Sequence, residues 1–73
     1  MENKELQMLN LFIKTRLNYC CLTASHASQQ AYYHQVFGAA DFLTHMHPEL
    51  AEEVANLWGE YDKKFQHIFF KNH

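Results

Sequence analysis

The spacing of apolar residues predicts a helix from Glu5 to Ala24 with apolar side chains on two faces. At about 100° per residue, a first stripe recurs every three or four positions, as in a helix that faces a core. This stripe consists of Leu6, Leu9, Ile13, Leu17, Cys20 and Ala24. A second stripe lies roughly opposite and consists of Met8, Leu11, Phe12, Tyr19 and Leu22. Because a surface helix carries only one apolar stripe, we expect this helix to be covered on two sides.

A second helix is predicted from about Ser28 to His45, after a break within residues 24–28. Its core stripe consists of Tyr32, Val36, Ala39, Leu43 and Met46. If the first helix continued without a break, this stripe would lie about 100° away from the first one. Ser25 or Ser28 could cap the new helix. The alternative is one long helix from Asn3 to Met46 whose faces contact different partners along its length.

A third helix follows the His47-Pro48 pair. The residue before a proline avoids the α region, and proline suits the first position of a helix. The third helix carries the clearest stripe of the chain, which consists of Leu50, Val54, Leu57, Tyr61, Phe65 and Ile68, with Trp58 and Phe69 beside it. Because the connection is short, the second and third helices should form an antiparallel hairpin. The sequence thus predicts an all-α fold of three helices, with residues 1–73 forming one helical domain.

The chain is short for a stable core. Domains of this size bury only ~60% of the surface that the unfolded chain exposes, and a disulfide, a metal or a second chain usually adds the missing stability. Cys20 and Cys21 are neighbours, and their side chains point about 100° apart on a helix, so they cannot form a disulfide with each other. The uncovered second stripe instead predicts a homodimer. Its interface would consist of Met8, Leu11, Phe12, Tyr19 and Leu22.

Composition restricts the location and the partners. Free thiols and the lack of a secretory leader indicate a cytoplasmic protein, and no apolar run exceeds four residues, which argues against a membrane partner. The net charge is −2 and no lysine/arginine cluster occurs, which argues against nucleic acid as a partner. The expected partners are a second copy of the chain and a further protein.

Histidine is frequent, with six residues among 73. His34, Asp41 and His45 fall within about 40° of one line on the second helix, opposite its core stripe. Imidazole and carboxylate groups bind metals. However, the three residues span about 16 Å along the helix axis, so only Asp41 and His45 could share one ion. We expect a solvated polar face, with no metal or cofactor.

The segment from His34 to Ala40 resembles the phosphoacceptor segment of histidine-phosphotransfer domains. In both, a histidine is followed four positions later by a glycine, here Gly38, and then by two small residues. The resemblance covers seven residues and implies a helical bundle in which His34 accepts a phosphoryl group. The segment departs from the family at Phe37, where a lysine is usual, and Asp41 would repel a phosphoryl group on the same face.

Catalytic signatures are missing from the sequence. It contains no Glu-x-x-His pair of the di-iron type, no serine nucleophile motif and no glycine-rich phosphate loop. We therefore expect a small cytoplasmic protein–protein interaction module without catalytic activity. The alternative is a phosphotransfer or metal-sensing bundle that uses His34.

Overall fold

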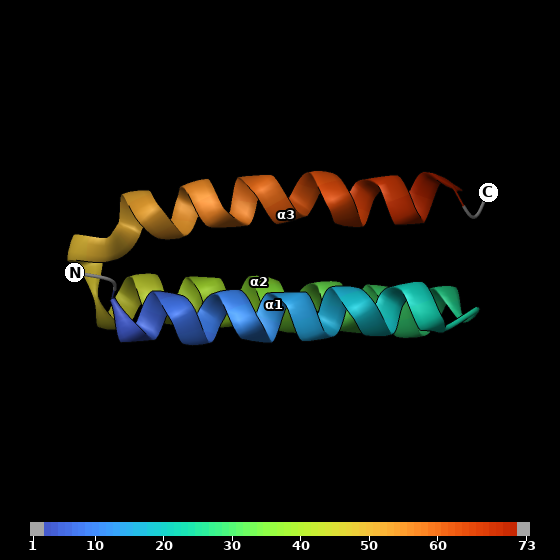
Figure 1. Cartoon of the computed structure of the whole chain (residues 1–73), viewed down its shortest axis with the longest axis horizontal. Coiled ribbons are helices and arrows are strands. Elements are labelled where there is room, and N and C mark those ends of the chain that lie inside the picture. The colour runs from blue at the N-terminus through green and yellow to red at the C-terminus, as the bar shows by residue number, and fades with distance from the viewer. Residues whose placement is uncertain (1–2, 72–73) are drawn as a thin grey trace.

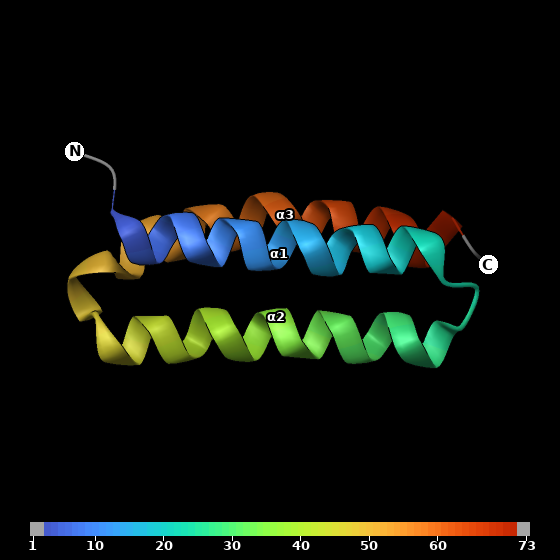
Figure 2. The same cartoon turned by 60° about the horizontal axis from the view of Figure 1, so that its bottom comes forward.

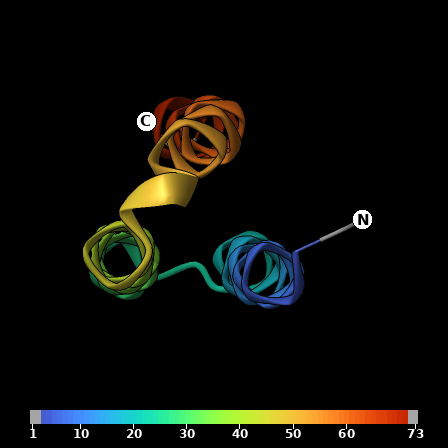
Figure 3. The same cartoon turned by 90° about the vertical axis from the view of Figure 1, so that its left-hand side faces the viewer.

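The computed structural model describes residues 3–71 and contains three α-helices and one 3₁₀ turn within that range. α1 spans Lys4–Leu22, α2 spans His26–Met46 and α3 spans Ala51–Lys71, and the 3₁₀ turn Pro48–Leu50 precedes α3. The chain reverses direction at each connection, so α1 and α3 run the same way and α2 runs against both (Figures 1 and 2). Viewed end-on, α1 and α2 lie side by side and α3 lies on one side of the pair (Figure 3).

Side-chain caps define where α1 and α2 begin. The Asn3 side chain accepts hydrogen bonds from the backbone N–H groups of Glu5 and Leu6, at 2.9 and 3.2 Å. Ser25 caps α2 by accepting from the N–H of Ser28 at 3.2 Å. Such caps satisfy donors that a helix start leaves without partners. The predicted break is confirmed, and the alternative of one helix over residues 3–46 is wrong.

The break begins earlier than the sequence indicates. Ala24, predicted as the last residue of the first stripe, is exposed and lies in the connection between α1 and α2. No glycine or proline ends α1. Instead, the Gln29 amide nitrogen in α2 donates to the carbonyl oxygens of Cys20 and Thr23, at 3.0 and 3.3 Å. Because these carbonyls have a donor from another helix, α1 can stop there.

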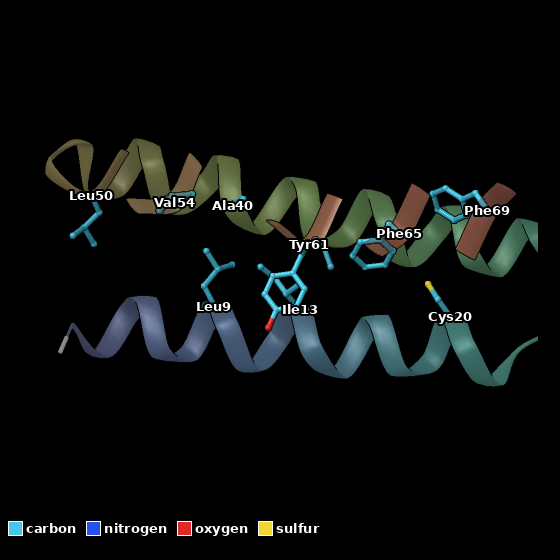
Figure 4. Packing of buried hydrophobic residues seen from close by; sticks show 10 residues of the cluster. Leu9, Ile13, Cys20, Ala40, Leu50, Val54, Tyr61, Phe65 and Phe69 are labelled. Atoms are coloured by element: carbon cyan, nitrogen blue, oxygen red, sulfur yellow. The ribbon is translucent and has the colours of Figure 1, made fainter. Parts of the chain in front are cut away.

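All three helices contribute to the core (Figure 4). Its buried apolar members are Leu9, Ile13, Cys20, Val36, Ala40, Leu50, Val54, Tyr61, Phe65 and Phe69. The predicted stripe of the third helix is confirmed, since its members are buried or packed against the core. In α2, however, Met46 is exposed and Ala40 is buried. Ala40 lies beside Val54 and Trp58 of α3, so the buried arc of α2 extends further toward α3 than the predicted stripe does.

Tyr33 joins α2 to α3. Its ring lies 5.6 Å from the ring of Phe65 and 5.5 Å from that of Phe69, in edge-to-face arrangements with interplanar angles of 84° and 66°. Its hydroxyl donates to the Asp62 carboxylate at 2.8 Å. Such edge-to-face pairs add to the stabilisation from apolar burial. The α2–α3 contact is thus aromatic and hydrogen-bonded, and it leaves the opposite side of α2 uncovered.

Candidate interaction surface

The side of α1 and α2 that faces away from α3 forms one surface, which we call the α1/α2 face. Its members on α1 are Glu5, Met8, Leu11, Phe12, Arg16, Tyr19 and Leu22, and those on α2 are Gln35, Phe42 and Met46. Direct contacts join the two helices here. The Arg16 Nε donates to the Gln35 Oε1 at 2.8 Å, and the rings of Tyr19 and Tyr32 lie 5.5 Å apart.

Apart from Leu22 near the far end of α1, which is 75% exposed, four large apolar side chains on this face are mostly exposed. The exposed fraction is 64% for Met8, 67% for Leu11, 66% for Phe42 and 60% for Met46. Because α1 and α2 run antiparallel, the Arg16–Gln35 and Tyr19–Tyr32 contacts fix which residues of the two helices lie at the same height along the bundle. Phe42 falls at the level of Leu9, and Met46 falls one turn nearer the end of α2. The four side chains therefore gather at one end of the face, and we call them the apolar patch.

The predicted interface residues divide into two groups. Four of them are exposed in the single chain, namely Met8, Leu11, Tyr19 and Leu22. Phe12 is half-buried and packs against the core. The guanidinium of Arg16 stacks on its ring and covers part of it. Phe42 and Met46 also belong to this face but were not predicted to, although their spacing of 7 and 11 residues from Gln35 marks one line on α2.

Arg16 is the cation of this face and is held in place by its neighbours. Its guanidinium carbon lies 4.4 Å from the ring centre of Phe12 and 5.6 Å from that of Tyr19. Stacking on aromatic rings and the bond to Gln35 hold the side chain against the surface. Within residues 3–71 the ion pairs involve only histidines and their carboxylates, so no acidic group neutralises Arg16.

The histidine face of α2 brings together two of its three predicted members. The Nδ1 of His45 lies 2.9 Å from the backbone oxygen of Asp41 and 3.7 Å from its carboxylate. His34 is exposed and lies two turns away from Asp41. No group of three or more histidine, cysteine, aspartate or glutamate side chains in the described part of the chain is arranged to hold a metal ion.

The surroundings of His34 differ from those of a phosphoacceptor. Phe37 packs its ring 5.8 Å from that of Trp58, at the position where the resembling family has a lysine. A Cβ added at Gly38 would meet nothing within 4 Å, so the glycine lies on open surface. The imidazole of His34 is accessible, but Phe37 brings no positive charge beside it.

The two cysteines differ in environment. Cys20 is fully buried, and burial together with the neighbouring Cys21 raises the pKa of its thiol to about 11. A thiol of that pKa stays protonated at neutral pH and is a poor nucleophile. Cys21 is exposed.

Cavities offer little chemistry. The largest described one, of about 570 Å³, lies between α1 and α3 and is lined by Asn3, Leu6, Gln7, Asn10, Leu50, Glu53 and Leu57. Acid–base catalysis uses positioned proton donors and acceptors of matched pKa. Among the described residues that line this cavity, only Glu53 has a titratable side chain. The α1/α2 face is therefore the better candidate for a functional surface.

No helix within residues 3–71 is both long enough and apolar enough to cross a bilayer. Comparison of the chain with protein-family models, with curated proteins and with solved structures finds no match.

Proposed function

We propose that the protein is a non-catalytic protein–protein interaction module that acts as a homodimer through its α1/α2 face. The apolar patch is the observation that supports this proposal. Its four side chains expose on the order of 500 Å² of surface, taking roughly 150–250 Å² for a large side chain in full. A patch of this size matches the largest apolar patch of a typical monomer, and such patches often serve in binding. With Phe12, Tyr19 and Leu22 farther along α1, the face approaches the roughly 800 Å² that each partner buries in a standard interface.

The dimer would complete a helical bundle that one chain cannot complete alone. The α1–α2 pairs of two copies would pack face to face, with the hairpin of α2 and α3 held against α1 in each copy. The outer surface would then remain available to a further protein. We place this module in the cytoplasm, because Cys20 and Cys21 are free thiols, which suit a reducing compartment.

Sedimentation equilibrium of a double variant tests the proposal. In Leu11→Glu with Phe42→Glu, two exposed side chains become charged, so the chain should stay folded and become monomeric. Replacing Phe12 would be less informative, because Phe12 also packs against the core. The matched control is Phe70→Glu, which changes a residue of α3 that is 71% exposed and lies outside the face.

The expected result is a dimer for the wild type and the control, and a monomer with unchanged helix content for the double variant. A wild-type monomer at micromolar concentration would overturn the proposal. So would a double variant that still dimerises.

The second candidate function is phosphoryl acceptance by His34, which its exposed imidazole favours. Incubation with phosphoramidate, followed by mass spectrometry, distinguishes the two functions. A phosphoryl group on His34 that is lost in His34→Gln would favour this candidate. An unmodified chain that dimerises would favour the interaction module.

A further inference from the structure

Two opposite charges flank the apolar patch on α1. Glu5 and Arg16 are eleven residues apart, which is close to three helical turns and about 16 Å along the axis. They therefore lie on the same line of the helix, with Met8 and Phe12 between them. Neither side chain forms an ion pair within residues 3–71.

Arg16 restricts what can cover this face. Its guanidinium is held by Phe12, Tyr19 and Gln35, so it has little freedom to turn toward solvent when a partner docks. Burying a cation without a counter-charge is strongly unfavourable. A partner that covers the patch must therefore bring an acidic group to Arg16.

We infer that this group is Glu5 of a second copy, in a two-fold dimer whose α1 helices cross antiparallel beside Leu11. The inference rests on the proposed function and specifies its geometry. In a two-fold interface, each surface must be complementary to itself. The order of charges along α1 meets that requirement, because an antiparallel copy places Glu5 opposite Arg16 at both ends at once.

Apolar side chains lie around the point where this two-fold axis would pass, although Met46 lies farther toward the level of Glu5. The midpoint between Glu5 and Arg16 lies between Asn10 and Leu11. Met8 and Phe12 lie within three residues of that midpoint, and Phe42 of α2 lies at the level of Leu9. Apolar side chains would therefore meet around the axis, and the charged pairs would close the interface on both sides.

A parallel arrangement of the two α1 helices is disfavoured by the same charges. It would place each Arg16 opposite the Arg16 of the other copy, inside an apolar interface. Like charges at close range in such a setting repel strongly. The antiparallel crossing pairs opposite charges and separates like ones.

Charge reversal tests the pairing. Glu5→Arg alone and Arg16→Glu alone each place like charges at both pairing positions, so each should weaken the homodimer at least tenfold in Kd. Glu5 is exposed and its side chain makes no described contact, so Glu5→Arg perturbs the fold little. Lys14→Glu is the matched control, since it makes the same charge change as Arg16→Glu at an exposed position outside the face.

Two further samples should restore binding. In a mixture of Glu5→Arg chains with Arg16→Glu chains, opposite charges meet at both positions, so a heterodimer should form that neither chain forms with itself. A chain that carries both reversals should homodimerise again. Rescue by the double reversal excludes a purely structural role of Arg16, because the intrachain contacts of its guanidinium stay lost.

The outcomes separate this inference from the proposed function. Homodimers of wild-type affinity in both single variants, or a double reversal that fails to rescue, would overturn the Glu5–Arg16 pairing. If Leu11→Glu with Phe42→Glu still abolishes the dimer in that case, the proposed function stands without the pairing. A wild-type monomer would overturn both.

Discussion

At the scale of single residues, the buried Gln29 joins the start of α2 to the end of α1. It is 1% exposed, and its amide nitrogen binds two carbonyl oxygens at the end of α1. Its Oε1 finds no donor within the described part of the chain. Gln29 thus stabilises the end of α1 through its amide nitrogen, while its amide oxygen is buried without a hydrogen-bond donor among the described residues.

Replacing Gln29 tests this role. Gln29→Leu keeps a buried side chain of similar size but leaves the carbonyls of Cys20 and Thr23 without their donor. We expect the free energy of unfolding to fall by about 1–3 kcal/mol, the usual cost of a buried polar group without a partner. Urea denaturation followed by circular dichroism measures the change. Gln30→Leu is the control, because Gln30 is exposed, and equal losses in the two variants would contradict the role of Gln29.

The raised pKa of the Cys20 thiol predicts how the stability of the fold responds to alkaline pH. Burial and the neighbouring Cys21 raise the pKa of its thiol from 9.0 to about 11, so the folded chain holds this proton more tightly than the unfolded chain. This stabilisation is fully present below pH 9 and is lost as the pH rises toward 11. A pKa difference of this size between the folded and unfolded chain corresponds to about 3 kcal/mol in the free energy of unfolding.

Thermal melts at pH 8 and pH 11 provide the measurement for Cys20. The wild type should lose Tm between these values, and Cys20→Ala should lose less, although it starts from a lower Tm because a core side chain is shortened. Burial also raises the pKa of Tyr33 and Tyr61, so some loss should remain. Equal losses in the wild type and Cys20→Ala would contradict the assignment. Cys21→Ala, which changes an exposed thiol, should behave as the wild type does.

At the scale of elements, the sequence predicts α3 best. α3 also packs against two helices, but the side chains that contact them belong to its one apolar stripe, so the stripe and the core contacts coincide. α2 packs against two helices, and the spacing of apolar residues does not show how its buried arc is divided between them. Ala40 is small and near the edge of the predicted stripe, yet it is buried, whereas the larger Met46 is exposed.

The candidate surface could be predicted only in part for the same reason. The second stripe of the first helix identified Met8 and Leu11, which are exposed in the structure. The contribution of α2 depends on which of its sides faces α3, and the contacts of Tyr33 determine that orientation. Phe42 joins the surface only once α2 is placed, so helical periodicity alone could not group it with Met8.

Gly59 gives a prediction about α3 itself. It lies inside the helix, it is exposed, and a Cβ added there would meet nothing within 4 Å. Gly59→Ala should therefore raise the free energy of unfolding by about 1 kcal/mol, because alanine restricts the unfolded chain more and favours the helix. Urea denaturation measures the gain. A loss of stability would show that another surface approaches α3 at this position.

At the scale of the whole molecule, we expect the stability of the fold to depend on dimerisation. A chain of 73 residues has a small core, and part of its apolar surface lies on the α1/α2 face, where only a partner can bury it. When folding and dimerisation are coupled, mass action makes the folded state more stable as the protein concentration rises.

We therefore expect the Tm of the wild type to increase by several degrees between roughly 1 and 100 μM, since a hundredfold change in ligand or partner shifts stability by about 2.7 kcal/mol. Leu11→Glu with Phe42→Glu should melt at a lower temperature that does not depend on concentration, because its folded chains no longer bind one another. Phe70→Glu should retain the dependence of the wild type. A wild-type Tm that is the same at both concentrations would show that the three helices are stable without a partner, and that the apolar patch contributes nothing to the stability of the fold.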